Sequence, residues 1–274
     1  MSRKHNKNNH GHRNERQSTA KHKGVLVRAA SAFIPEGEKK KIIIFTDDML
    51  INQLRRDGPK IEESFDRLCA NELSELSELL SKTNGLIYSG LSIGVQKEDE
   101  LRSACAQLLL NGTNSFAAAT AILRMGYVLQ PGIIVRAILE TVSTSLHLMQ
   151  YPKDLVAYKN NSLQSPKTIS AAKRILPPFG LLYGHFSDNF AHIGKLHKSI
   201  TLIREYTEHH DALNFNLCSL RIAAWLLYVS AELVFNELVP APRYWHRVEQ
   251  GYKYDPSEGE KEWMKYFFQI NNSS

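Results

Sequence analysis

The sequence predicts an all-α protein, a multi-helix bundle with a central apolar helix near its C-terminus and a disordered basic tail at its N-terminus. From residue 61 onward, apolar residues recur at intervals of three and four, which places them on one face of a helix. Hydrophobic residues make up 43% and charged residues 23% of the 274-residue chain, a balance typical of globular proteins. We therefore expect one helical domain over residues 61–274.

Residues 1–23 form a histidine-rich tail that we expect to be disordered. The tail holds seven lysines and arginines against one glutamate, and it has no aliphatic residue between Met1 and Ala20. Such a segment cannot bury enough apolar surface to offset the entropy lost on ordering. The rest of the chain has 27 bases and 27 acids, so the net charge of +6 lies in the tail. A solubilising extension is the simplest interpretation, and weak metal chelation or contact with RNA or anionic lipid are alternatives.

Residues 24–60 combine two short apolar runs, GVLV and IIIF, with the polar stretch PEGEKKK between them. This pattern is compatible with a short strand pair or with an irregular lead-in. No helical periodicity is evident before Pro59.

Four helices are expected in the first half of the bundle. They cover residues 61–80, 101–111, 115–129 and 132–150. Gly112 is expected to end the second helix, Asn114 can cap the third, and Pro131 suits the first turn of the fourth.

The longest apolar helix is predicted over residues 211–239. Arg221 and Glu232 interrupt it and leave ten uncharged residues between them, whereas a bilayer span needs roughly 20. We therefore expect a core helix and no membrane span. Shorter helices are expected over residues 153–160, 165–175, 179–193 and 258–270.

The three cysteines, Cys69, Cys105 and Cys218, are odd in number, far apart and surrounded by apolar helical residues. We expect reduced, buried thiols in a cytoplasmic protein. Because no CxxC pair occurs, a zinc knuckle is not expected.

The segment 179–193 separates into three faces when it is drawn as a helix at 100° per residue. One face is apolar, and a second carries only small residues. The third presents His185, Asp188 and His192, two imidazoles with a carboxylate between them.

Three interpretations of this polar face remain open. The face could contribute to a metal site, for which residues 208–211 (EHHD) are the candidate second ligand cluster. It could perform acid–base chemistry, with Asp188 orienting either ring. It could also hold histidines that are hydrogen-bonded within a polar seam of the bundle.

Arg136 and Glu140 border the apolar stripe of the fourth predicted helix, four residues apart. Such a pair is usually a structural ion pair. A partly buried arginine is also suited to binding phosphate through its planar, bidentate guanidinium.

The run from Ser115 to Tyr158 resembles the central segment of a group of uncharacterised all-helical bacterial proteins. In that group a small-residue helix precedes an Arg-x-x-x-Glu helix, here Arg136 and Glu140, and a later helix carries the Tyr, Ser and His that correspond to Tyr183, Ser187 and His192. The group is similar to the HEPN helical-bundle superfamily, many of whose members cut RNA without a metal. The resemblance covers about Leu101 to Leu238.

The resemblance implies a metal-independent endoribonuclease, or an RNA-directed effector in a defence or toxin-like setting, that dimerises and needs no cofactor. In that case His192 would accept the proton of a ribose 2′-hydroxyl, His185 would protonate the leaving oxygen, and Arg136 would stabilise the phosphorane. Asn189 would match a polar position of the family's motif. The complete candidate site comprises His192, His185, Arg136, Asp188, Glu140, Asn189 and Tyr183.

Active HEPN nucleases place an arginine a few residues before the catalytic histidine on the same helix. Here His185 and Asp188 lie in that stretch, and no arginine does. A non-catalytic interaction or scaffold protein is therefore the alternative function, and a metal-dependent hydrolase using His185, Asp188 and His192 is the third. RNA and a second copy of the chain are the expected partners.

Overall fold

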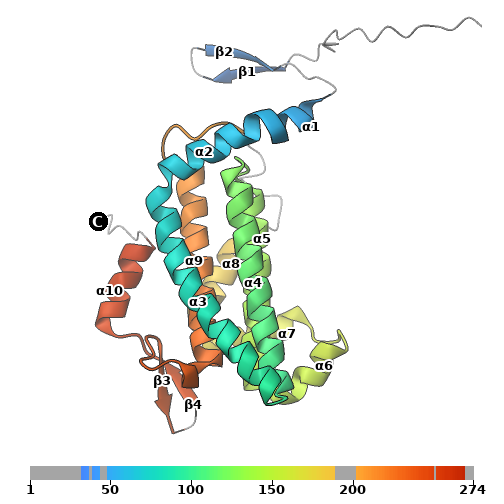
Figure 1. Cartoon of the computed structure of the whole chain (residues 1–274), viewed down its shortest axis with the longest axis vertical. Coiled ribbons are helices and arrows are strands. Elements are labelled where there is room, and N and C mark those ends of the chain that lie inside the picture. Colours follow the sequence, from blue (N-terminus) through green and yellow to red (C-terminus); the bar gives the residue numbers. More distant parts are fainter. Residues whose placement is uncertain (1–31, 37–38, 44–47, 189–201, 250, 269–274) are drawn as a thin grey trace, which may run out of the picture. The chain divides into compact units, whose positions relative to one another are not determined.

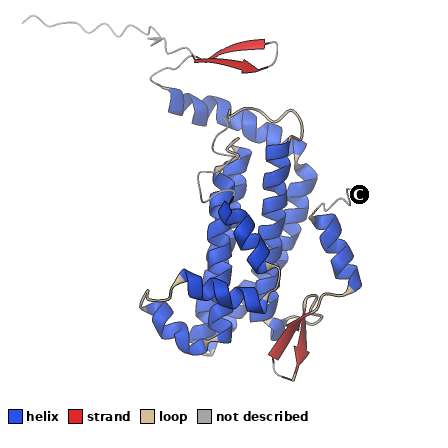
Figure 2. Ribbon diagram, turned by 180° about the vertical axis from the view of Figure 1, so that it is seen from behind, coloured by secondary structure: helices blue, strands red, loops and turns tan. Residues whose placement is uncertain are grey.

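The computed structural model describes residues 32–36, 39–43, 48–188, 202–249 and 251–268 (Figures 1 and 2). The chain divides into two compact units, Met1–Asn52 and Gln53–Ser274. The tail predicted over residues 1–23 lies outside the described residues.

The first unit contains a strand pair, but it does not join the two apolar runs of the sequence: its first strand is the AFIPE segment, and the GVLV run lies outside the described residues. Strands β1 (Ala32–Glu36) and β2 (Lys39–Ile43) pair antiparallel, with Glu36 opposite Lys39. The PEGEKKK stretch therefore contains the ends of both strands and the connection between them. A short helix, α1 (Met49–Asn52), follows.

The second unit is an all-α bundle, which confirms the predicted fold class. Its four long helices are α3 (Ala70–Gln96), α4 (Glu100–Arg124), α5 (Gln130–Gln150) and α9 (Asp211–Val234). Helix α9 packs against the other three, while α4 packs against both α3 and α5. In Figure 1 these helices run side by side along the length of the unit.

Helix α9 is the central helix of the bundle, as predicted. From Leu220 to Val234 nearly every side chain is buried, including those of Arg221 and Glu232. By length and composition alone, both α5 and α9 could cross a membrane, but 89% of the apolar window of α9 is buried against the protein. Such burial is typical of a core helix.

Several predicted helix ends were wrong. The ends expected at residues 80, 129 and 239 lie instead at Gln96, Arg124 and Val234. The helix expected over residues 61–80 is divided at Cys69 into α2 (Gly58–Leu68) and α3. Gly112 does not end a helix but lies inside α4, where a Cβ atom would stand 2.7 Å from Leu227 Cδ2 of α9. The glycine therefore permits close approach of two helices.

The short helices predicted between α5 and α9 are present. A 3₁₀ turn (Pro152–Asp154) leads into α6 (Leu155–Lys159), followed by α7 (Ser165–Ile175) and α8 (Phe179–Phe186). Helix α8 packs against α5 and α7.

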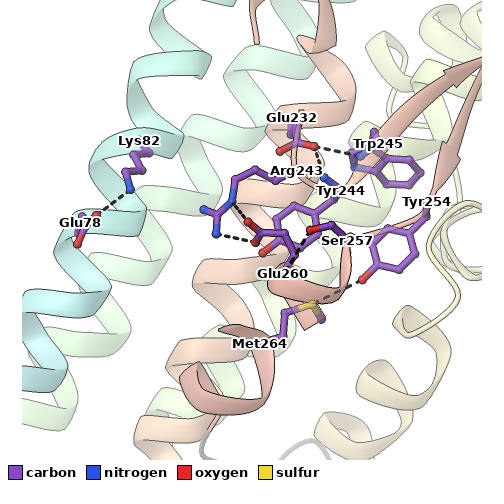
Figure 3. A network of polar contacts seen from close by, with 10 residues as sticks. All are labelled: Glu78, Lys82, Glu232, Arg243, Tyr244, Trp245, Tyr254, Ser257, Glu260 and Met264. Carbon is purple, nitrogen blue, oxygen red and sulfur yellow. Dashed lines mark hydrogen bonds and ion pairs between the residues drawn. The ribbon is translucent and has the colours of Figure 1, made fainter. Parts of the chain in front are cut away.

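The C-terminal segment contains a hairpin that the sequence did not predict. Strands β3 (Trp245–Val248) and β4 (Gly251–Tyr254) precede α10 (Glu258–Phe267). A buried carboxylate anchors the hairpin to the bundle, because Glu232 Oε1 accepts hydrogen bonds from the backbone N–H groups of Tyr244 and Trp245 at 2.7 and 3.1 Å. Figure 3 shows these contacts.

Arg243 links the same segment to α10. Its Nε and Nη2 atoms donate to the two carboxylate oxygens of Glu260 at 2.7 and 2.6 Å, a bidentate ion pair (Figure 3). The guanidinium carbon lies 5.0 Å from the ring centroid of Trp263 and 5.7 Å from those of Tyr228 and Tyr244. Arg243 therefore binds one carboxylate and three aromatic rings at once.

The cysteines are free, as predicted. Cys69 and Cys105 are buried and Cys218 is partly buried. Burial raises the pKa of the Cys69 and Cys105 thiols to about 12, so both are protonated at neutral pH where no metal ion replaces the proton.

A bidentate ion pair between α2 and α4 makes a pH-dependent contribution to stability. Arg124 Nε and Nη2 donate to the two carboxylate oxygens of Asp66 at 2.7 and 2.6 Å, and these hydrogen bonds lower the pKa of Asp66. A lowered pKa means that the stabilisation is complete above the unfolded-state value and is lost as the pH falls through the folded-state value.

We expect the wild-type protein to unfold at a higher denaturant concentration than Asp66→Asn above about pH 5, with the difference shrinking below about pH 4. Denaturation curves at a series of pH values measure this difference. A difference that stays constant into the acid range would show that the charge of Asp66 is not its source.

Candidate functional site

The candidate site is a polar cluster between α5 and α8, centred on Arg136. Tyr183 and Ser187 lie four residues apart, so both side chains project from the same side of the chain at α8. Arg136 Nη2 donates to the Tyr183 hydroxyl at 3.0 Å, and Arg136 Nε lies 3.3 Å from Ser187 Oγ. The guanidinium carbon also lies 5.6 Å from the centroid of the Tyr183 ring, within the range of a cation–π contact.

Glu140 completes this cluster. Its Oε1 atom lies 3.1 Å from Arg136 Nη2, and both side chains are about one-third exposed. The predicted Arg136–Glu140 pair therefore forms, and two hydroxyl groups from another helix contact the arginine. We call Arg136, Glu140, Tyr183 and Ser187 the Arg136 cluster.

Glu140 also lines an open depression of about 430 Å³ on the surface of the bundle. Most of its polar lining residues carry a hydroxyl group, and one of them, Thr168, forms a buried hydrogen bond of 3.0 Å with Ser143. Partial burial raises the pKa of Tyr158 in the same depression. The lining residues are Leu108, Ala137, Glu140, Thr141, Thr144, Tyr158, Asn161, Leu163, Ser165 and Thr168.

His185 and Asp188 are both exposed. His185 lies two residues from Tyr183, about 200° around a helix, and so points away from the face that contacts Arg136. Its ring lies 5.4 Å from that of Phe215 in α9 and 5.5 Å from that of Phe186. Two members of the predicted site, Asn189 and His192, lie outside the described residues.

The structure therefore brings together three of the predicted site residues, Arg136, Glu140 and Tyr183, and adds Ser187. The depression beside Glu140 was not anticipated, because threonines and serines on separate helices give no motif in the sequence. Residues 208–211 were predicted as a second cluster of metal ligands beside His185, Asp188 and His192. In the structure, His210 Nδ1 caps α9 by accepting from the Leu213 N–H, and His209 approaches Cys69 and Glu72, two partners that were not predicted.

The Arg136 cluster is suited to binding an oxyanion. A guanidinium offers several N–H donors in a planar fork, which matches the oxygens of a phosphate, and the two hydroxyls can donate to the same anion. Glu140 acts in the opposite direction, because its carboxylate repels an anion and competes for the guanidinium. An incoming phosphate would have to displace Glu140 from Arg136.

Comparison with known proteins adds no functional assignment. No family model matches the chain, and no curated protein or solved structure matches it either.

Proposed function

We propose that this protein acts on RNA and that the Arg136 cluster binds a backbone phosphate of the RNA. The observation that carries the proposal is the position of the Arg136 guanidinium, held between the hydroxyls of Tyr183 and Ser187 while one-third of the side chain stays exposed. An arginine oriented in this way loses little further conformational freedom when it binds a phosphate.

The resemblance to HEPN proteins extends this proposal to RNA cleavage without a metal. In the reaction, the ribose 2′-oxygen loses its proton and attacks the adjacent phosphorus, and the 5′-oxygen leaves with a proton. The products are a 2′,3′-cyclic phosphate and a 5′-hydroxyl end. Arg136 would stabilise the additional negative charge of the phosphorane. The roles of His192 as base and His185 as acid derive from the sequence alone. The direction of His185 does not support its role, because this side chain points away from the face of α8 that contacts Arg136.

Replacing Arg136 with alanine is expected to weaken the binding of single-stranded RNA by about tenfold, because one charge-assisted contact to phosphate is lost. Fluorescence anisotropy at a single fixed salt concentration measures the change. Tyr183→Phe, which removes only a hydroxyl, is expected to have a smaller effect in the same direction.

The matched control is Arg67→Ala, because Arg67 is an exposed arginine of α2 outside the cluster. Equal losses in Arg136→Ala and Arg67→Ala would show that RNA responds only to overall charge. Circular dichroism of each variant establishes that the bundle is still folded.

Cleavage is tested by incubating the full chain with RNA, with and without a chelator, beside Arg136→Ala and His192→Ala. We expect cleavage that survives the chelator and is lost in both variants. Cleavage that requires a metal would favour the hydrolase alternative built on His185, Asp188 and His192.

A second function, that of a non-catalytic helical interaction protein, is favoured by one contact. Glu140 already neutralises Arg136 at 3.1 Å, as in a purely structural ion pair. Intact RNA and no detectable RNA binding would support this second function.

Self-association and a cytoplasmic location also remain predictions. Light scattering of the purified chain tests self-association.

A further inference from the structure

Three potential metal ligands converge at the junction of α2 and α3, distant in sequence from the Arg136 cluster. The Cys69 Sγ atom, a Glu72 carboxylate oxygen and a His209 ring nitrogen all lie within 4.8 Å of one another. Cys69 separates the two helices, and Glu72 follows in the first turn of α3. His209 comes from the segment just before α9.

A hydrogen bond orients the His209 ring towards the other two groups. His209 Nδ1 lies 3.0 Å from the amide oxygen of Asn214, an acceptor, so Nδ1 carries the proton. The lone pair is then on Nε2, which lies 3.9 Å from Glu72 Oε1. That distance is too long for a hydrogen bond. Metal-binding histidines commonly donate their second N–H to an oxygen in this way.

The spacing of the three groups is close to that of a zinc site. Ligand atoms around a tetrahedral zinc ion stand roughly 3.3–3.8 Å apart, given zinc–ligand bonds of roughly 2.0–2.3 Å. Because the three ligand atoms lie within 4.8 Å of one another, side-chain rotations that shorten each distance by at most about 1 Å would bring them to the spacing of zinc ligands.

The surroundings are also compatible with a bound ion. Cys69 is fully buried, the Glu72 side chain is 14% exposed and the His209 side chain 37% exposed, so the group opens to solvent at the histidine. The nearby buried guanidinium of Arg221 binds Glu75 Oε2 at 3.0 Å, which compensates its positive charge.

We propose that Cys69, Glu72 and His209 form a zinc-binding site with a fourth position open to water or to another ligand. Zinc accepts sulfur, nitrogen and carboxylate oxygen together, whereas magnesium and calcium prefer oxygen alone. A bound zinc ion would connect the α2–α3 junction to the segment that leads into α9. This site is independent of the proposed RNA function.

The test uses cobalt as a spectroscopic substitute for zinc in the full, reduced chain. We expect one equivalent of cobalt to produce a thiolate-to-cobalt charge-transfer band in the near ultraviolet, and zinc to displace it. Cys69→Ser is expected to abolish the band, whereas Cys218→Ser retains it. His209→Gln is expected to weaken binding at least tenfold, whereas His246→Gln, at an exposed histidine of β3, leaves it unchanged.

These variants separate the site from the four histidines of the N-terminal tail, His5, His10, His12 and His22. Cobalt binding without a thiolate band would assign the metal to such histidines and overturn the proposal. Equal affinity in wild type and His209→Gln would also overturn it, as would the absence of binding. Because His209 is partly exposed, its variant retains the fold even if Cys69→Ser does not, and circular dichroism checks both.

Discussion

Glu232→Ala is expected to lower the free energy of unfolding by about 3 kcal/mol or more, the largest effect of any single change considered. Glu232 is completely buried, and its Oε1 atom accepts the backbone N–H groups of both Tyr244 and Trp245. These two residues are themselves buried, with 0% and 1% exposure, so water cannot replace the lost acceptor. Two buried N–H groups would remain unpaired. Chemical denaturation monitored by circular dichroism measures the loss.

Glu232→Gln is the matched variant, because its amide oxygen can still accept both hydrogen bonds. We expect it to lose much less stability than Glu232→Ala. If the two variants are equally destabilised, the negative charge rather than the acceptor holds the hairpin. Glu249→Ala, at an exposed position of the same hairpin, controls for the loss of a carboxylate.

Gly90→Ala is expected to destabilise the bundle by about 2–3 kcal/mol through overpacking, although alanine is the better helix former by about 1 kcal/mol. A Cβ atom on Gly90 would stand 2.3 Å from Cε1 and 2.4 Å from Cδ1 of the Phe235 ring. Phe235 is fully buried and cannot move without disturbing its neighbours. The loss of stability is measured as a lower melting temperature in thermal unfolding and a lower midpoint in chemical unfolding.

Gly85→Ala provides the control in the same helix, five residues earlier. Apart from the adjacent residues and the nearby backbone of its own helix, no heavy atom of the described chain lies within 4 Å of the Cβ position at Gly85, which is exposed. This variant is expected to be neutral or to gain up to about 1 kcal/mol from helix propensity. If Gly90→Ala lowers the free energy of unfolding and Gly85→Ala raises it, close packing at Gly90 is supported as the cause. Changes of the same sign in both variants would contradict it.

The sequence predicted the helices best where the apolar spacing and the boundary residues agreed. Helix α7 has the predicted bounds, residues 165–175, and α5 begins one residue before Pro131. The prediction was wrong at Gly112, because this glycine lies inside α4, where the close packing of α4 against α9 requires its small size. That requirement comes from Leu227, more than a hundred residues away in the sequence.

In the candidate site, too, the contact within one helix could be predicted and the contacts between helices could not. The pairing of Arg136 with Glu140 could be predicted, since residues four apart on a helix are neighbours. The contacts of Arg136 with Tyr183 and Ser187 depend on the packing of α8 against α5, which no local pattern encodes.

By itself, the sequence determined the all-α class and the core helix, because periodic apolar residues dictate which face of each helix is buried. Only the tertiary structure decided which polar side chains meet: the Arg136 cluster, the Glu232 anchor, and the approach of His209 to Cys69 and Glu72. The physical reason is that such contacts join residues distant along the chain. Their geometry is set by how whole helices pack, and not by the residues beside them in the sequence.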